Sequence, residues 1–190
     1  MTDQAARARQ KQQKALCVWL TGLPGAGKST LAQALERRLH DQGRHVTLLD
    51  GDALRGGLNR DLGFSRAERD ENVRRAGEVA RLMVDAGLIV VCAFISPYRA
   101  QRRQVRALLG PGEFIEVYLD ASAAVCEARD PKGHYARARR GEIAGFTGID
   151  GSYEAPEAAE LRLDTATLSI DACVDRMLEK IAAAGDVPAA

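Results

Sequence analysis

The chain has 190 residues, with 27 basic and 26 acidic side chains and a formal net charge of +1. This near-neutral charge argues against a general nucleic-acid binder, and no apolar run reaches the roughly 18 residues of a membrane helix. The length fits one domain, and a hydrophobic content of 46% is enough to bury a core. Arginine outnumbers lysine by 22 to 5, which reflects either genomic base composition or the binding of phosphate-like oxyanions.

The two ends of the chain lack the alternating strand and helix patterns of its centre. Residues 1–15 are polar and basic without the apolar stretch of a secretory signal, so we expect a flexible basic tail or a short helix there. Residues 16–184 are expected to form a single domain, followed by a C-terminal tail at 185–190. The four cysteines are far apart and form no CxxC pair, which favours reduced thiols and a cytoplasmic location.

Five short apolar runs predict the strands of a parallel sheet. The first three are continuous rather than alternating, as is typical of strands that are covered on both faces. Helical patterns lie between the runs, and this alternation predicts a three-layer α/β fold with a parallel sheet. The expected strands are residues 16–21, 46–49, 88–94, 114–119 and 161–163.

Four helices have recognisable starts. The first begins at Gly27 and carries leucines at four-residue spacing. The second begins at Ser65, whose spacing to Glu68 predicts a capping box, and it ends near residue 86. The third is expected to begin with Ser96 as its N-cap, because a proline follows in the first helical position. The last covers about residues 170–181.

Residues 130–153 differ from the rest of the chain. They are polar and rich in arginine and glycine, and they have little apolar periodicity. A segment of this length in a compact domain is typically functional rather than part of the core. We therefore expect a lid that closes over a site.

A glycine-rich segment after the first strand matches the pattern GxxxxGK[ST] of phosphate-binding loops. Together with the alternation of strands and helices, it predicts a three-layer fold of the kind found in P-loop nucleoside triphosphatases. Backbone N–H groups of such a loop surround a β-phosphate, and the following helix N-terminus adds partial positive charge. Lys28 would bridge the β- and γ-phosphates, and the Ser29 hydroxyl would bind Mg²⁺. The predicted ATP-binding residues here are Gly22, Leu23, Pro24, Gly25, Ala26, Gly27, Lys28, Ser29 and Thr30.

Polar residues follow the second and third expected strands, where a parallel sheet opens onto its ligand crevice. Asp52 is predicted to act near the Mg²⁺ as a general base or as a water-mediated metal ligand, and the alternative is an ordinary turn aspartate. Arg69 and Asn72 are three residues apart on one face of the capped helix. Ser96 either takes part in the chemistry or caps the third helix.

These segments together resemble the adenylylsulfate kinase (APS kinase) family. The resemblance runs from Val18 to about Ile181, and its selective blocks are DGDALRGGLNRDLGFS, ERDENVRR, FISPYR, ARDPKG and FTGID. It implies transfer of the γ-phosphoryl group of ATP to the ribose 3′-hydroxyl of adenosine 5′-phosphosulfate (APS), giving PAPS and ADP, with Mg²⁺ as cofactor.

The resemblance also implies a role for individual residues. Lys28, Asp52 and Ser96 would be catalytic, and Arg129 at the start of the lid would reach ATP. The family's serine is described as a phosphoserine intermediate, whereas direct in-line transfer needs only positioning, so both alternatives stay open. The residues implied to bind APS are Asp52, Arg55, Phe64, Arg69, Asn72, Ile95, Ser96, Lys132 and Phe146, with Phe64 and Phe146 stacking on its adenine.

The resemblance further implies a homodimer and a functional coupling to a separate ATP sulfurylase. From the net charge and the short apolar runs we expect no nucleic-acid or membrane partner. Two other interpretations stay open. One is a phosphate-loop kinase for another small hydroxylated acceptor, and the other is a nucleotide-binding module without catalysis. The intact Lys28, Ser29 and Asp52 argue against the second of these.

Overall fold

A computed structural model of the chain describes residues 2–185. Its centre is a five-stranded sheet in the order β2-β3-β1-β4-β5, and every neighbouring pair of strands is parallel. This confirms the predicted α/β fold with a parallel sheet. The strands are β1 (Leu16–Thr21), β2 (Val46–Asp50), β3 (Ile89–Ala93), β4 (Phe114–Asp120) and β5 (Leu161–Asp164).

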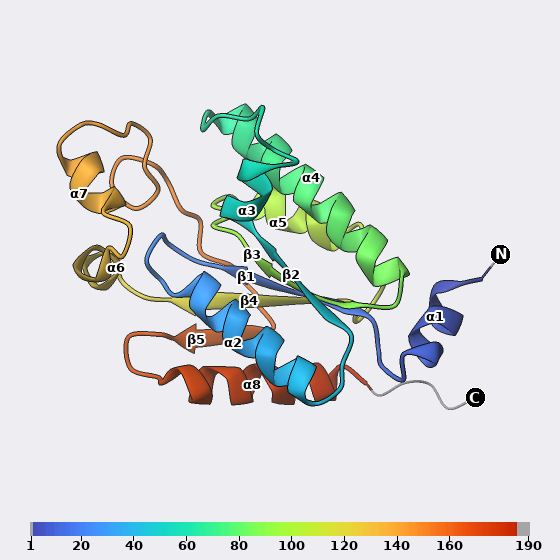
Figure 1. Ribbon diagram of the computed structural model, residues 1–190. Helices are drawn as coiled ribbons and strands as arrows, with labels where there is room; N and C mark the ends of the chain where they lie inside the picture. Colours follow the sequence, from blue (N-terminus) through green and yellow to red (C-terminus); the bar gives the residue numbers. More distant parts are fainter. Residues whose placement is uncertain (1, 186–190) are drawn as a thin grey trace.

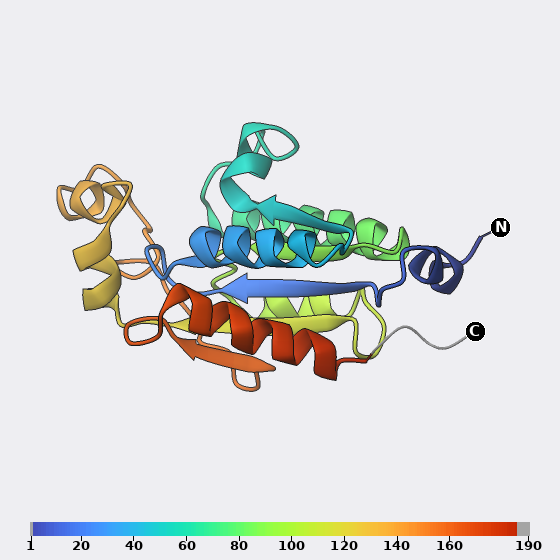
Figure 2. The same ribbon diagram turned by 60° about the horizontal axis from the view of Figure 1, so that its bottom comes forward.

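Helices cover both faces of this sheet and give the three layers (Figures 1 and 2). The long helices α2 and α8 pack together on one face, and α4 and α5 pack together on the other. The helices are α1 (Gln4–Gln10), α2 (Lys28–Asp41), α3 (Gly51–Gly56), α4 (Arg66–Asp85), α5 (Arg99–Arg106), α6 (Ala123–Arg129), α7 (His134–Arg139) and α8 (Ile170–Ala183).

Strand β1 is buried along its whole length, which explains its unbroken run of apolar residues. Leu16, Val18 and Leu20 belong to the core beneath α2 and α8. Cys17 and Trp19 alternate with them and belong to the core beneath α4 and α5. The central strand is therefore covered on both sides, and its carboxyl end lies near the segments α3, α6 and α7 (Figure 1).

The N-terminal segment takes the second of its two expected forms, a short helix. Helix α1 begins after Asp3, whose side chain accepts a hydrogen bond from the backbone of Ala6. Ala8 of this helix packs in the core, and the buried Gln13 binds backbone atoms of two other segments. Of the expected C-terminal tail, residues 186–190 lie outside the described residues.

The prediction that Ser96 is a helix N-cap is wrong. Helix α5 begins at Arg99, and the backbone N–H of Tyr98 is bound by the side chain of Gln101 instead. Ser96 has a left-handed φ of 37°, and its hydroxyl is held inside the protein by Trp19 and Thr21 of strand β1. By contrast, the capping box of Ser65 and Glu68 on α4 is confirmed.

Candidate active site

The phosphate loop connects the end of β1 with the start of α2. Gly25 has a φ of 79°, and a Cβ atom there would lie 2.6 Å from the carbonyl oxygen of Cys126. Only glycine fits such a position without strain. The loop therefore lies against α6, and the N-terminus of the 14-residue helix α2 stands directly behind it. This is a suitable geometry for a bound phosphate.

Lys28 stands in the first turn of α2 and folds back over the loop. Its Nζ donates to the carbonyl oxygens of Gly22, at 2.9 Å, and Leu23, at 2.8 Å. Loss of water around the amine lowers the pKa of Lys28 from 10.5 to about 8. The acceptors of this cation are only neutral carbonyl oxygens. Negatively charged phosphate oxygens would form stronger hydrogen bonds with it than these carbonyls do.

Ser29 and Asp50 meet at the start of α2 and the end of β2. The Ser29 hydroxyl donates to Oδ2 of Asp50 at 2.7 Å, while Oδ1 of Asp50 accepts from the backbone N–H of Asp52. The sequence analysis missed Asp50, although its place at the carboxyl end of a strand was a usable signal. A hydroxyl and a carboxylate are hard oxygen donors of the kind that Mg²⁺ prefers.

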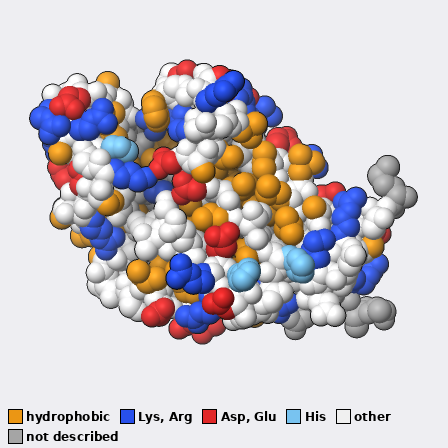
Figure 3. Space-filling model, viewed as in Figure 1, with side chains coloured by type: hydrophobic (Ala, Val, Ile, Leu, Met, Phe, Trp, Pro, Cys, Tyr) orange, Lys and Arg blue, Asp and Glu red, His pale blue; other side chains and the backbone are white. Residues whose placement is uncertain are grey.

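Asp52 of α3 forms an ion pair with Lys132, which lies between α6 and α7. The Asp52 side chain is 68% exposed, so it is open to a ligand. The carboxylate also raises the pKa of Lys132 through their hydrogen bond. This pair joins α3 to the expected lid, and acidic and basic side chains gather in the hollow between these two parts of the molecule (Figure 3).

A cavity of about 560 Å³ lies between the N-terminus of α4 and the loop at residues 144–152. Arg69 lines it and ties its walls together. The guanidinium donates to the carbonyl oxygen of Phe64 at 2.8 Å and to that of Gly145 at 2.9 Å. It also donates to the hydroxyl of Thr147 at 3.2 Å. The cavity is thus bordered by two of the expected APS-binding residues, Phe64 and Arg69.

The two phenylalanines expected to stack on one adenine have different surroundings. Phe64 is 66% exposed, and the guanidinium of Arg55 lies 4.4 Å from its ring centroid. Phe146 is only 8% exposed, and its ring meets the ring of Tyr135 edge-on at 5.0 Å. Phe64 therefore offers an open aromatic face, whereas Phe146 is packed in the core of this conformation.

Asn72 is held by a second asparagine that the sequence analysis did not single out. Asn59 is fully buried, and its Nδ2 donates to Oδ1 of Asn72 at 3.0 Å. The Oδ1 atom of Asn72 thus accepts a hydrogen bond inside the protein. Its Nδ2 atom is the group that can donate a hydrogen bond to a ligand. The spacing of 13 residues, across a turn, gave no signal for this pairing in the sequence.

Arg129 ends α6 and reaches toward the phosphate loop. Its Nη1 lies 3.4 Å from the carbonyl oxygen of Gly25, and its Nη2 donates to the carbonyl oxygen of Thr165. The side chain therefore stands at the edge of the expected ATP site. Of the sequence-predicted residues, Lys28, Ser29 and Arg129 lie at the loop. Asp52 meets Lys132, and Phe64 meets Arg55 and Arg69. By contrast, Ile95 and Ser96 lie beside β1, and Phe146 is packed in the core.

Ser96 is 2% exposed and lies at the end of β3. Its Oγ accepts a hydrogen bond from Nε1 of Trp19 at 3.0 Å and donates to the hydroxyl of Thr21 at 3.1 Å. Thr21 in turn donates to the carbonyl oxygen of Ile95 at 2.7 Å. This arrangement holds the segment at Ile95 and Ser96 in place, and it shields the hydroxyl from solvent.

We expect the Ser96→Ala substitution to leave the protein active, with a fall of less than about tenfold in turnover, because the shielded hydroxyl serves as a structural contact. The loss of its hydrogen bonds, with Trp19 Nε1 left unpaired, is expected to cost about 1–3 kcal/mol of stability. Activity measurements and thermal melts of the purified variant check both parts. Complete loss of activity in a well-folded Ser96→Ala protein would instead favour a phosphoserine intermediate.

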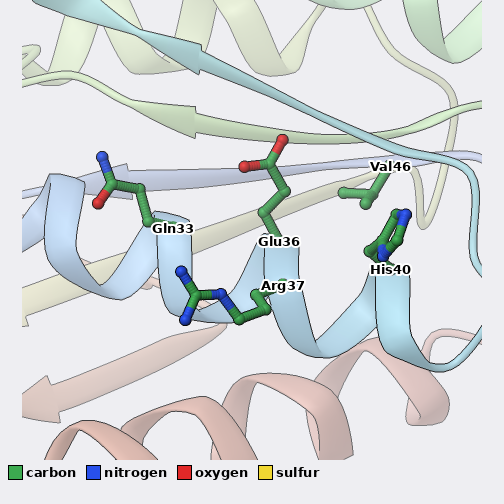
Figure 4. Close-up of a pocket in the computed structure, with 5 residues that line it drawn as sticks. All are labelled: Gln33, Glu36, Arg37, His40 and Val46. Carbon is green, nitrogen blue, oxygen red and sulfur yellow. The ribbon is translucent and has the colours of Figure 1, made fainter.

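A second, smaller cavity of about 380 Å³ lies on the surface of α2, and none of the predicted site residues lines it (Figure 4). Its lining side chains are Gln33, Glu36, Arg37, His40 and Val46. In the described part of the chain, no three histidine, cysteine or acidic side chains cluster as they would around a metal ion. None of the helices within residues 2–185 has the length and hydrophobicity needed to cross a membrane.

The chain is similar to known proteins in sequence and in fold. Residues 14–164 match the family model described as adenylylsulphate kinase. The adenylyl-sulfate kinase of Aeromonas hydrophila is 61% identical over 176 residues, which is 93% of this chain and 89% of that protein.

Two solved structures are also similar. The first is that of the Mycobacterium tuberculosis APS kinase CysC in complex with AMPPNP and APS, with a TM-score of 0.86 and 44% identity, covering 89% of this chain and 98% of that one. The second is a hexameric APS kinase from Thiobacillus denitrificans, with a TM-score of 0.69 and 39% identity, covering 94% of this chain and 31% of that one.

Proposed function

The chain belongs to the adenylylsulfate kinase family, and from this premise we propose that it transfers the γ-phosphoryl group of ATP to the ribose 3′-hydroxyl of APS, giving PAPS and ADP. One observation supports this most directly. The phosphate loop with Lys28 and the acceptor-side pair of Asp52 and Lys132 lie at the same carboxyl edge of one parallel sheet. A donor phosphate and an acceptor hydroxyl can therefore meet there.

On the ATP side, the proposal assigns the triphosphate to the loop at residues 22–30. Lys28 exchanges its two carbonyl partners for β- and γ-phosphate oxygens, and its charge balances the charge of the transferring group. Ser29 and Asp50 would hold Mg²⁺, which neutralises charge on the β- and γ-phosphates when it is bound. Arg129 stands close enough to the loop to assist at the phosphates.

On the APS side, Arg55, Arg69 and the amide of Asn72 are assigned to the phosphosulfate and ribose. Arginine suits this role because its planar guanidinium binds tetrahedral oxyanions at two points. Phe64 is assigned to the adenine face, since its ring is exposed and aromatic.

The remaining acceptor-side residues complete the site. Asp52 accepts the proton of the attacking hydroxyl, and the positive charge of Lys132 balances part of the negative charge of the bound APS. Ile95 and Ser96 position the acceptor through their backbone.

We assign residues 130–153 to a lid over this site. The lid meets the rest of the site through the pair of Lys132 and Asp52 and through the bonds from Arg69 to Gly145 and Thr147. Phe146 lies in the same segment, so a movement of the lid that frees its ring would bring it toward the adenine opposite Phe64. Closure would also keep water from the γ-phosphate, which would otherwise be hydrolysed.

The direct test is ADP formation by the purified protein with ATP, Mg²⁺ and APS, followed in a coupled assay. ADP formation that depends on APS, with PAPS as the second product, supports the proposal. Turnover on a panel of nucleosides and sugars but not on APS would identify another phosphate-loop kinase. ATP binding without turnover on any acceptor would point to a non-catalytic nucleotide-binding module.

Proton uptake during ATP binding is expected because of the lowered pKa of Lys28. In the free protein this pKa is about 8, whereas a phosphate partner favours the charged amine and raises it. Near pH 9, ATP binding should therefore take up close to one proton, and near pH 7 Lys28 should take up almost none. Calorimetry in two buffers of different ionisation enthalpy measures this uptake. A Lys28→Met variant is the control and should show no uptake near pH 9.

We further infer that the protein assembles with copies of itself, as a homodimer, and acts in the cytoplasm together with a separate ATP sulfurylase. Hydrophobic side chains gather on the face that carries β2, α3 and α4 (Figure 3), and β2 is an edge strand of the sheet. These features are compatible with a partner on that side. Light scattering coupled to gel filtration measures the mass in solution, and a monomer would contradict the assembly.

A further inference from the structure

Arg102 of α5 is a buried charged residue with an unusual set of partners. Its side chain is 2% exposed. Its Nε donates to Oε1 of Glu116 in β4 at 2.7 Å, and its two terminal nitrogens donate to backbone carbonyl oxygens. Nη1 binds the carbonyl of Ser96 at 2.7 Å, and Nη2 binds the carbonyl of Glu154 at 2.6 Å. One guanidinium thus joins three separate parts of the chain.

Both of these carbonyls belong to segments at the acceptor side of the site. Ser96 has a left-handed φ of 37°, which a residue with a side chain rarely adopts and which the surrounding contacts must maintain. Glu154 follows directly after the lid segment 130–153. Its backbone N–H donates to the carbonyl of Pro97 at 2.8 Å, and its side chain accepts from the backbone N–H of Arg99 at 2.8 Å. The two segments therefore lie side by side, with Arg102 beneath them.

Packing between α5 and β4 does not require a charge at this position. An isolated buried charge is costly, and hydrophobic residues often fill such places with equal or greater stability. The planar guanidinium offers what a hydrophobic or a lysine side chain cannot, namely donors fixed in one plane that reach three acceptors at once. The buried arginine is therefore explained by the two loop carbonyls that it holds, with Glu116 balancing its charge.

We propose that Arg102 is a positioning residue for the acceptor substrate. It holds the segment Ile95–Pro97 in its left-handed turn and fastens the end of the lid to it. This proposal rests on the proposed function, because it concerns the same acceptor site. Since Arg102 touches neither the phosphate loop nor, in the contacts described above, any residue assigned to ATP, its effect should be confined to the acceptor.

The test compares Arg102→Lys with a matched control, Arg106→Lys. Arg106 lies one turn further along α5 and shares the partner Glu116, but its other partner is Glu160 and it binds neither loop carbonyl. Steady-state kinetics are measured for both substrates at a temperature where melting curves show each variant folded. We expect Arg102→Lys to raise the KM for APS about tenfold and to change the KM for ATP less than twofold. Arg106→Lys should change neither KM more than twofold.

Equal changes in both KM values, or a fall in kcat alone, would overturn the proposal, because a general loss of structure has that signature. If Arg102→Lys does not fold, Glu116→Gln provides the second test, since it loosens the anchor of Arg102 while it keeps an acceptor oxygen. It should raise the KM for APS alone, and an unchanged KM for APS would count against the proposal. Failure of the wild-type protein to use APS would contradict the proposed function instead.

Discussion

Lys28→Ala is expected to lower the rate of phosphoryl transfer by about 10³-fold, which corresponds to ~4 kcal/mol of transition-state stabilisation. The ammonium group already lies over the phosphate loop, where it binds only the carbonyls of Gly22 and Leu23. In the transition state negative charge spreads over the oxygens of the transferring group. The nearby Lys132 is paired with Asp52, so it is not placed to take over the position of the missing cation. Coupled ADP production at saturating ATP and APS measures the loss.

The same substitution is expected to leave thermal stability unchanged or raised. Below pH 8 the amine is charged in both the folded and the unfolded chain, and its lowered pKa means that the folded state bears the cost of holding that charge. Removal of the amine removes this cost, which is otherwise relieved only as the pH rises from about 8 toward 10.5. Lys180→Ala, on the distant helix α8, is the control for a lost lysine. A Lys28→Ala protein that keeps more than a tenth of its activity would contradict the assigned role.

Asp52→Asn is expected to reduce kcat by about 10²–10⁴-fold, the range typical for loss of a general base. Asparagine keeps the shape of the side chain but cannot accept a proton, and it also loses the charge that pairs with Lys132. Lys132→Gln separates these two effects, because it breaks the ion pair and leaves the carboxylate. If Asp52 acted only by holding Lys132, the two variants would lose the same activity, whereas we expect Lys132→Gln to act mainly on the KM for APS.

Asp50 is a second aspartate near the site, and a variant of it distinguishes metal binding from the proposed base role of Asp52. Asp50 binds the Ser29 hydroxyl and caps α3, so its proposed contribution is to the metal ion rather than to the acceptor hydroxyl. Asp50→Asn should therefore raise the Mg²⁺ concentration needed for half-maximal activity, and Asp52→Asn should not. A titration with Mg²⁺ at fixed ATP distinguishes the two aspartates. An equal Mg²⁺ shift in both variants would contradict the assignment of Asp52 as the base.

Much of the fold could be predicted from the sequence because its signals are local. Short apolar runs, the first three of them continuous, marked all five strands to within about one residue at each end, since both faces of the central strands are covered. The capping box at Ser65 marked the start of α4. The short helices α3, α6 and α7 escaped prediction because six or seven residues show less than two turns of periodicity.

The candidate site was predictable where a motif is contiguous and less so where it depends on contacts across the fold. The phosphate loop, Asp52 and Lys132 were each named from recognisable blocks, whereas the ion pair between Asp52 and Lys132 is visible only in the structure. The role of Ser96 as a cap was wrong, because a proline after a serine is typical of helix starts, and the competing bond from Trp19 lies 77 residues away in sequence. Asn59 and Arg102 were missed for the same reason, since their partners are set by packing.

The candidate site lies at the carboxyl ends of the strands, and Gln13 stabilises the opposite, amino end of the sheet. The amide of this buried side chain donates to the carbonyls of His45 and Gly87 and accepts from the N–H of His45, so it stands in for a peptide group beside the start of β2. The chain segments just before β2 and β3 are thereby joined by a residue from the polar N-terminal stretch. Movement of the proposed lid would then fall to the opposite end of the sheet, where the contacts are an ion pair and loop hydrogen bonds that a substrate could replace.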